Sequence, residues 1–146
     1  MPRGALGLMP EATERKSPRM DEQRVLIIDD DEFVRKHIRT ILERAGFIAL
    51  EARNGDEGLI KVAEAVPDLV ITDLLMPEKD GIETIIQLRK SHPDIKIIAM
   101  SGGGHVIGRD VLKSARLFGA AITLIKPFLA DELLQAVHKL TDRNRT

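Results

Sequence analysis

Side chains that could bind a metal ion or take part in a reaction stand directly after short apolar runs of this sequence. They are Asp29, Asp30 and Asp31 after the first run, Asp73 after the third, Ser101 after the fourth and Lys126 after the fifth. Short, near-continuous apolar runs are typical of strands buried in a parallel sheet, and the carboxyl ends of such strands meet along one edge. We therefore expect acids, a hydroxyl and an ammonium group to converge there.

Crowded carboxylates of this kind predict a cation. Two carboxylates about 4 Å apart repel each other by about 4 kcal/mol at an effective dielectric constant of about 20, and a hard divalent ion relieves that repulsion. Oxygen ligands without His or Cys suit Mg²⁺, whose coordination is usually completed by water and phosphate oxygens. The chemistry that these groups favour is phosphoryl transfer, with Asp73 as the nucleophile and with Lys126 and Ser101 as donors to the phosphoryl oxygens.

Each of these residues also has a simpler interpretation. Asp31 is expected to cap the helix that follows it, and we leave it out of the site. Asp29 and Asp30 could be turn acids, Lys126 alone a surface charge and Ser101 alone a loop cap. The functional interpretation of the four rests on their joint position at strand ends.

Five apolar runs predict five strands. They are Val25–Ile28, Phe47–Leu50, Leu69–Thr72, Ile95–Met100 and Ala121–Ile125. The first, third and fourth are almost entirely apolar, as expected for central strands with helices on both faces.

Apolar residues at helical spacing fill the connections between the runs. The stripes are Val34, Ile38, Ile41, Leu42 and Ala45; Leu59, Val62, Ala63 and Val66; Ile82, Ile85 and Ile86; Val111, Ala115 and Phe118; and Leu133, Leu134, Val137 and Leu140. The expected caps and stops are Asp31, Asn54 (with Glu57) and Asp80 at helix starts and Gly46, Pro67 and Gly119 at helix ends. Five strand–helix units in about 120 residues require parallel pairing and right-handed crossovers, which predicts a doubly wound α/β fold of three layers.

The amino-acid composition excludes several classes of function. The chain has 22 basic and 23 acidic residues, a formal charge of −1, no Tyr, Trp or Cys and only four Phe. We therefore expect no direct nucleic-acid partner, because there is neither a basic field nor an aromatic stacking platform, and no thiolate or structural zinc chemistry. No stretch is long and apolar enough to span a membrane, so we predict a soluble, cytoplasmic protein without a membrane partner.

The chain is expected to hold one folded domain, residues 23–141, with a flexible extension over residues 1–22 and a short tail over 142–146. The extension carries Pro2, Pro10 and Pro18 and has no sustained apolar period. The natural start could also be Met20.

Three segments together resemble the receiver domains of response regulators in two-component signalling. They are Val25–Asp31, Val70–Gly81 with the order Asp73, Met76, Pro77, Asp80 and Gly81, and Lys126–Phe128. The resemblance covers about residues 23–141 and implies a flavodoxin-like sheet of five strands in the order 2-1-3-4-5. It also implies that the chain is a phosphorelay switch rather than a conventional enzyme, catalysing only its own phosphorylation and dephosphorylation.

The resemblance implies a role for each site residue. Asp73 would accept the phosphoryl group, with Asp30 and Asp73 as direct Mg²⁺ ligands and Asp29 acting through a water on the ion. Leu75 would contribute its backbone carbonyl to the ion. Lys126 would contact the phosphoryl oxygens, and Ser101 would shift to hydrogen-bond one of them. A cis Lys126–Pro127 bond is also implied.

The implied partners are a histidine kinase or phosphotransfer protein as donor and an unknown downstream protein. The downstream protein would bind the face built from the fourth helix, fifth strand and fifth helix, and phosphorylation could also drive dimerisation. The family often has an aromatic residue three positions before the lysine, where this chain has Thr123. We therefore expect ordering of the loop that contains Gly102, Gly103 and Gly104, rather than ring rotation, to carry the signal.

Three alternatives stay open at this point. Asp29 and Asp31 form a D-x-D pattern, which also occurs in haloacid-dehalogenase-type phosphatases with the first Asp as nucleophile. The chain could be the receiver part of a longer transcriptional regulator. It could also be a degenerate receiver that only binds partners.

Overall fold

The fold alternates strands and helices along the chain, as the apolar runs predict. The computed structural model describes residues 22–75, 81–102 and 106–141, with the backbone alone for 106–111. Its elements are β1 (Arg24–Ile28), α3 (Glu32–Arg44), β2 (Ile48–Ala52), α4 (Gly55–Glu64), β3 (Leu69–Asp73), α5 (Gly81–Ser91), β4 (Lys96–Gly102), α6 (Val106–Phe118), β5 (Ile122–Lys126) and α7 (Ala130–Thr141). The expectations for residues 1–21, Met76, Pro77, Asp80, Gly103 and Gly104, and 142–146 lie outside the described residues.

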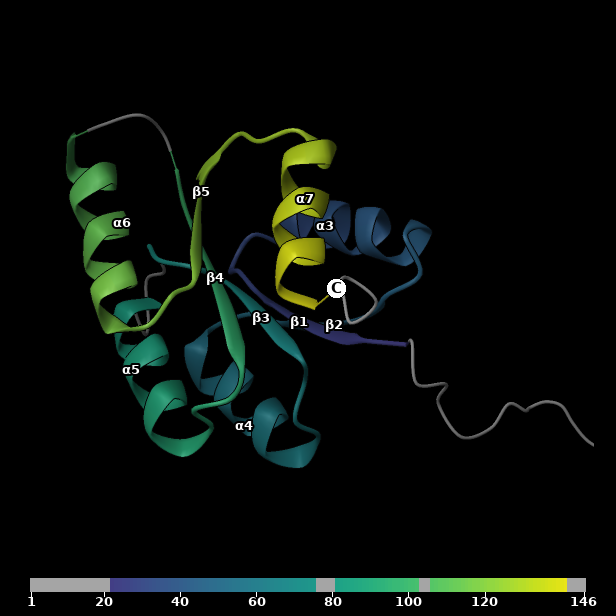
Figure 1. Cartoon of the computed structure of the whole chain (residues 1–146), viewed down its shortest axis with the longest axis horizontal. Helices are drawn as coiled ribbons and strands as arrows, with labels where there is room; N and C mark the ends of the chain where they lie inside the picture. The colour runs from purple at the N-terminus through teal and green to yellow at the C-terminus, as the bar shows by residue number, and fades with distance from the viewer. Residues whose placement is uncertain (1–21, 76–80, 103–105, 142–146) are drawn as a thin grey trace, which may run out of the picture.

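The five strands form one parallel sheet in the order β2-β1-β3-β4-β5. This confirms the doubly wound, flavodoxin-like fold and the central position of the first, third and fourth strands. Helices α3 and α7 cover one face of the sheet, and α4, α5 and α6 cover the other (Figure 1). The strand order reverses between β1 and β3, and in open α/β sheets this reversal is where ligands bind.

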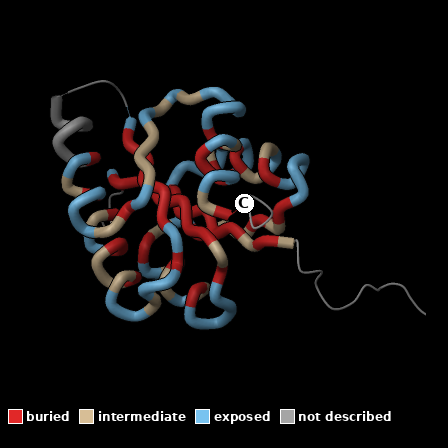
Figure 2. The backbone as a smooth tube through the Cα atoms, viewed as in Figure 1, coloured by how far each residue is buried: buried red, intermediate tan, exposed pale blue. Residues whose placement is uncertain are grey.

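Two apolar layers hold the sheet between its helices. Alternate residues of the central strands point to opposite faces, so Leu26 and Ile28 pack toward α4 and α5 while Val25 and Ile27 pack toward α3 and α7. The red segments of Figure 2 show this burial running through the strands and the inner faces of the helices. The continuous apolar strands therefore follow from burial on both faces.

Caps and turns define most helix ends at the predicted places. Asp31 Oδ1 accepts hydrogen bonds from the backbone N–H groups of Phe33 and Val34, and Asn54 Oδ1 accepts one from Glu57. Helix α6 ends just before Gly119, whose φ of +130° is the left-handed conformation that favours glycine.

Strand boundaries differ from the predicted runs in a consistent way. The second strand was expected at Phe47–Leu50 but is Ile48–Ala52, because the chain still turns at Phe47 and the ladder with β1 continues through Glu51. The third, fourth and fifth strands extend to Asp73, past Ser101 and to Lys126. The polar site residues on these strands therefore lie within the ladder, which fixes their backbone.

Among the stripe members whose side chains the structure describes, four are exposed. Phe118 is 48% exposed at the end of α6, and Val66 is 54% exposed because α4 ends at Glu64, two residues before it. Ala45 and Ala63 are also exposed. Each stands at or beyond the end of its helix or at the margin of its stripe, where the sheet no longer covers it.

Candidate functional site

Three carboxylates from two neighbouring strands meet at the carboxyl edge of the sheet. Asp29 follows β1 and is fully buried, Asp73 ends β3 and is 5% exposed, and Asp30 is exposed. One carboxylate oxygen from each lies within 4.8 Å of the others. Because β1 and β3 are paired in parallel, the sheet itself brings these acids together.

Lys126 lies against two of these acids. Its Nζ donates a hydrogen bond to Asp29 Oδ2 at 3.0 Å and lies 3.5 Å from Asp73 Oδ1. Burial alone would lower the pKa of Lys126, but the charge of Asp73 and the hydrogen bond to Asp29 outweigh it, so this pKa is raised. The ammonium group therefore stays charged and aimed at the acids.

Asp73 is held in an unusual electrostatic state for an aspartate. Its pKa is raised to about 6, because burial above all, and the charges of Asp29 and Asp30 with it, outweigh the lowering effects of Lys126 and the backbone N–H of Leu75. Near neutral pH the side chain is thus mostly ionised but poorly solvated. A group that neutralises negative charge has a direct reason to bind here.

Ser101 stands on β4 one residue beyond Met100, the position that pairs with Asp73. Its side chain is buried, and among the described residues its Oγ has no hydrogen-bond partner. An unsatisfied buried hydroxyl is costly, so a group added to Asp73 could satisfy it.

The donor set fits Mg²⁺. The cluster offers carboxylate oxygens and no nitrogen or sulfur, as a hard cation requires. Leu75 is 52% exposed directly beyond β3, and its N–H binds the Asp73 carboxylate. Two further expectations about this region are confirmed. Asp31 caps α3, and the Lys126–Pro127 peptide bond is cis.

A close backbone approach fixes the chain beyond Asp73. The N–H of Gly81 donates to the Leu74 carbonyl at 3.1 Å, and a Cβ at Gly81 would lie 2.3 Å from the Asp73 carbonyl oxygen. Only glycine fits this contact without displacement of the backbone. Gly81 therefore positions the start of α5 against the reactive end of β3.

Sequence reasoning missed a buried ion pair behind the acids. Arg35 is 7% exposed, and its guanidinium donates to the Asp29 carbonyl at 2.8 Å and to Glu51 Oε1 at 2.9 Å. The spacing of Arg35, Ile38 and Leu42 at i, i+3 and i+7 places the arginine on the buried face of its helix. Together with Glu51 in an otherwise apolar strand, this spacing was the available signal.

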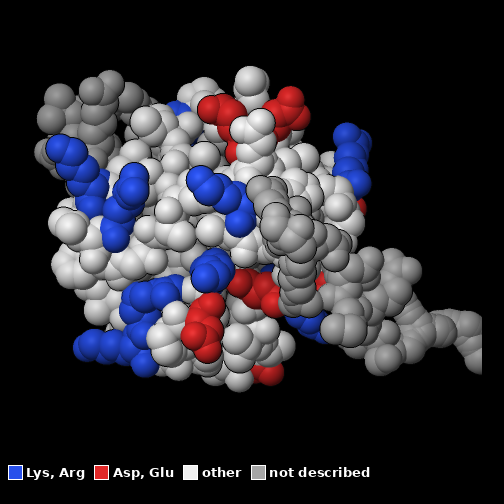
Figure 3. All heavy atoms as spheres, in the orientation of Figure 1, with Lys and Arg blue, Asp and Glu red and all other residues white. Residues whose placement is uncertain are grey.

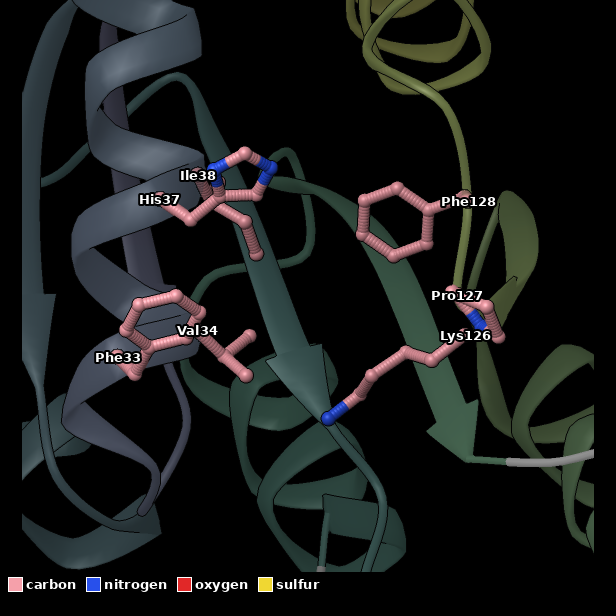
Figure 4. Close-up of a pocket in the computed structure, with 7 residues that line it drawn as sticks. All are labelled: Phe33, Val34, His37, Ile38, Lys126, Pro127 and Phe128. Carbon is pink, nitrogen blue, oxygen red and sulfur yellow. The ribbon is translucent and has the colours of Figure 1, made fainter.

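Sequence reasoning also missed an apolar groove beside Lys126. Its lining residues are Phe33, Val34, His37, Ile38, Lys126, Pro127 and Phe128, and its volume is about 460 Å³. Figure 4 shows the α3 side chains on one side, Pro127 and Phe128 on the other, and the Lys126 amine at one end. The groove therefore lies between α3 and the segment after β5, next to the acids.

The sequence matches the family model described as the response regulator receiver domain over residues 25–138. The chain belongs to this family. Receiver domains are signalling switches, and the family works with histidine kinases or phosphotransfer proteins and with downstream targets. The match favours the receiver interpretation over the haloacid-dehalogenase alternative.

Similar proteins agree with this assignment. The chain is 37% identical over 120 residues to the chemotaxis protein CheY of Thermotoga maritima, covering 82% of this chain and 98% of that protein. It is 31% identical to the sporulation initiation phosphotransferase F of Bacillus subtilis, covering 82% and 94%. The receiver domain of NtrX from Brucella abortus superposes with a TM-score of 0.77 at 26% identity, covering 82% and 99%.

Two surface properties complete the description. Both signs of charge occur on the face seen in Figure 3, and neither forms a continuous field over it. Of the helices in the described ranges, none has the length and apolar content to cross a membrane.

Proposed function

We propose that this chain is a phosphorylation-dependent switch in which Asp73 accepts a phosphoryl group from a phosphohistidine of a kinase or phosphotransfer protein. The observation that carries the proposal is the joint placement of Asp73, Asp29, Asp30 and Lys126 at one edge of the sheet. Membership of the receiver family and the similarity to phosphotransferase F and CheY support it.

Asp29, Asp30, Asp73 and the Leu75 carbonyl are the groups that would hold Mg²⁺. When bound, the ion neutralises charge on the phosphoryl oxygens and on the acids. The proposal treats Asp30 and Asp73 as direct ligands and Asp29 as acting through water. It explains why three acids are kept together despite their repulsion.

The chain's own residues then perform the transfer. An oxygen of the Asp73 carboxylate attacks phosphorus, and a P–O bond forms as the P–N bond of the donor breaks, with the electron pair leaving on the imidazole nitrogen. Lys126 is already within 3.5 Å of Asp73 and donates to a phosphoryl oxygen. The resulting acyl phosphate is lost later by attack of water on phosphorus.

The added group changes the contacts of two side chains. Ser101 Oγ, which lacks a partner among the described residues, gains an acceptor, and Lys126 gains a more highly charged partner than the carboxylate. These differential contacts favour one arrangement of Ser101 and Lys126 over another. Thr123 stands half-buried on β5, so we propose that this change of contacts, rather than the rotation of an aromatic ring, carries the output.

Downstream binding is proposed at the face of α6, β5 and α7. Leu117 on α6 is 84% exposed, and Ile125 on β5 is 45% exposed. The strand β5 is the edge of the sheet beside β4, so movement after Ser101 reaches this face through directly paired residues. Dimerisation of the phosphorylated chain would use the same exposed groups.

The apolar groove is proposed to receive the phosphodonor protein. A donor histidine must approach Asp73 from the open edge of the sheet, beside Lys126, and the groove adjoins that amine. Phe33 is 81% exposed at its rim, a position suited to an apolar contact with a partner.

Intact-mass analysis after incubation with acetyl phosphate and Mg²⁺ tests the reaction class. The proposal predicts a single phosphoryl adduct on the wild-type chain and none on Asp73→Asn. Steady turnover of many phosphate esters without a lasting adduct would instead support a phosphatase. Absence of both adduct and turnover with a competent donor would support a partner-binding receiver that is not phosphorylated.

A further inference from the structure

The buried guanidinium of Arg35 lies directly behind the acidic cluster. The residue stands in the first turn of α3, yet only 9% of its side chain is exposed. It joins three elements, because its own helix holds the side chain while its donors reach the end of β1 and the middle of β2. Burying a charge in this way is expensive unless the charge is paired, so the contacts that it makes are informative.

On one side Arg35 is anchored by an acid that is itself held in place. Arg35 Nε donates to Glu51 Oε1 at 2.9 Å, and Glu51 Oε2 accepts from Arg39 at 3.0 Å. Burial raises the pKa of Glu51, but the hydrogen bonds from Arg39 and Arg35 outweigh it and the pKa is lowered. Glu51 is thus ionised near neutral pH and orients the guanidinium.

On the other side Arg35 holds the carbonyl of Asp29. That carbonyl belongs to the peptide group that joins Asp29 to Asp30, so its direction sets the direction of the Asp30 backbone. The remaining polar groups of Asp29 are also engaged. Its N–H donates to the Ala52 carbonyl, and its carboxylate accepts from the Asp31 N–H and from Lys126. Arg35 is the side chain in this set that fixes the link between the two acids.

We propose that Arg35 is a positioning residue that sets the spacing of Asp29 and Asp30 around the cation site. This inference rests on the proposed function, since it assumes that these acids hold Mg²⁺. Residues that orient metal ligands from outside the coordination sphere typically change metal affinity by about 10- to 100-fold when they are removed. Arg35 does so without occupying a ligand position, because it contacts the carbonyl and not the carboxylate.

Arg39 supplies a matched control on the same helix. It also donates to Glu51, at 3.0 Å, but the described structure gives it no contact with Asp29. Arg35→Met and Arg39→Met each remove one cation and one hydrogen bond to Glu51. Arg35→Met also removes the donor to the Asp29 carbonyl, whereas Arg39→Met instead removes the surface ion pair with Glu43.

The test is a titration with Mg²⁺ alone, without phosphodonor, followed by calorimetry and by the amide shifts of Asp29, Asp30 and Asp73 in ¹H–¹⁵N spectra. We expect Arg35→Met to raise the dissociation constant about tenfold or more and to shift the Asp30 amide before metal is added. Arg39→Met should change the constant less than about twofold. Arg35→Lys, which keeps one donor within reach, should recover part of the affinity.

Three outcomes overturn the inference, and they differ in what else they affect. Equal dissociation constants for Arg35→Met and Arg39→Met would contradict it and leave the proposed function intact. So would a lower melting temperature of Arg35→Met with wild-type affinity, which would make the residue merely structural. If Arg35→Met does not fold, Glu51→Gln, which removes the negative charge that orients the Arg35 guanidinium, is measured against Arg39→Met by the same criterion. A wild-type chain that binds no Mg²⁺ at these three amides would overturn both proposals.

Discussion

Replacement of the phosphoacceptor by its neutral isostere should make the metal-free protein more stable. The pKa of Asp73 is about 6 in the folded chain against an ordinary value of 3.8, because burial and the neighbouring acids disfavour the charged form. This rise in the pKa corresponds to about 3 kcal/mol at pH 7, which Asp73→Asn should recover. The pKa of Asp73 is higher in the folded chain than in the unfolded chain. The protonated side chain therefore costs the wild type no stability below pH 3.8, and the ionised side chain destabilises the fold as the pH rises through 6. The difference between the two proteins should therefore shrink to below about 1 kcal/mol at pH 4.

Urea unfolding followed by far-ultraviolet circular dichroism, in buffer with a chelator, measures this difference at pH 7 and pH 4. Other titrating groups largely cancel between the two proteins. Asp30→Asn is the matched control, since Asp30 is exposed and should give a smaller gain. Equal stability of Asp73→Asn and wild type at pH 7, or a difference that does not change with pH, would contradict the claim that the ionised Asp73 carboxylate destabilises the fold.

Three further predictions address the site, its backbone and its partner. In metal-free NMR samples the carboxyl carbon of Asp73 should titrate near pH 6, and Lys126→Met should raise that pKa because the ammonium group lowers it. A midpoint near pH 4 in the wild type would contradict the burial of this side chain. Gly81→Ala should destabilise the fold by about 1–3 kcal/mol in urea titrations, whereas Gly102→Ala should change stability little because open space surrounds the new Cβ. Equal effects of the two substitutions would contradict the close approach of Gly81 to Asp73. Phe33→Ala should slow phosphotransfer from a host histidine kinase that phosphorylates the wild type by at least about tenfold, while phosphorylation by acetyl phosphate stays unchanged. A loss of phosphorylation with both donors would argue against a docking role for the groove.

The sequence predicts the architecture well because burial on both faces leaves a strong local signal. Val25–Ile28 and Leu69–Thr72 are apolar without interruption, and such runs occur in central parallel strands. Strand ends were less predictable. The strand β2 extends past its predicted end at Leu50 to include Glu51, whose carboxylate pairs with Arg35 and Arg39 of α3. No local sequence pattern encodes such a tertiary contact.

The acids and Lys126 could be placed from strand ends alone, since parallel pairing converts positions along the sequence into neighbours. The described structure adds the burial of Asp73 and the missing partner of Ser101, neither of which a pattern can show. Arg35 was overlooked because a basic residue in the first turn of a helix usually faces solvent. Its helical spacing with Ile38 was the counter-evidence.

The central claim is that Asp73 itself becomes an acyl phosphate, and chemical trapping tests it most directly. The chain is incubated with acetyl phosphate in the presence of Mg²⁺ or of a chelator, reduced with borohydride and mapped by peptide mass spectrometry. Reduction converts a phosphorylated aspartate to homoserine, so the account predicts homoserine at position 73 in the Mg²⁺ sample alone. Homoserine at position 29, or labelling of position 73 that is equally strong with the chelator, would contradict it.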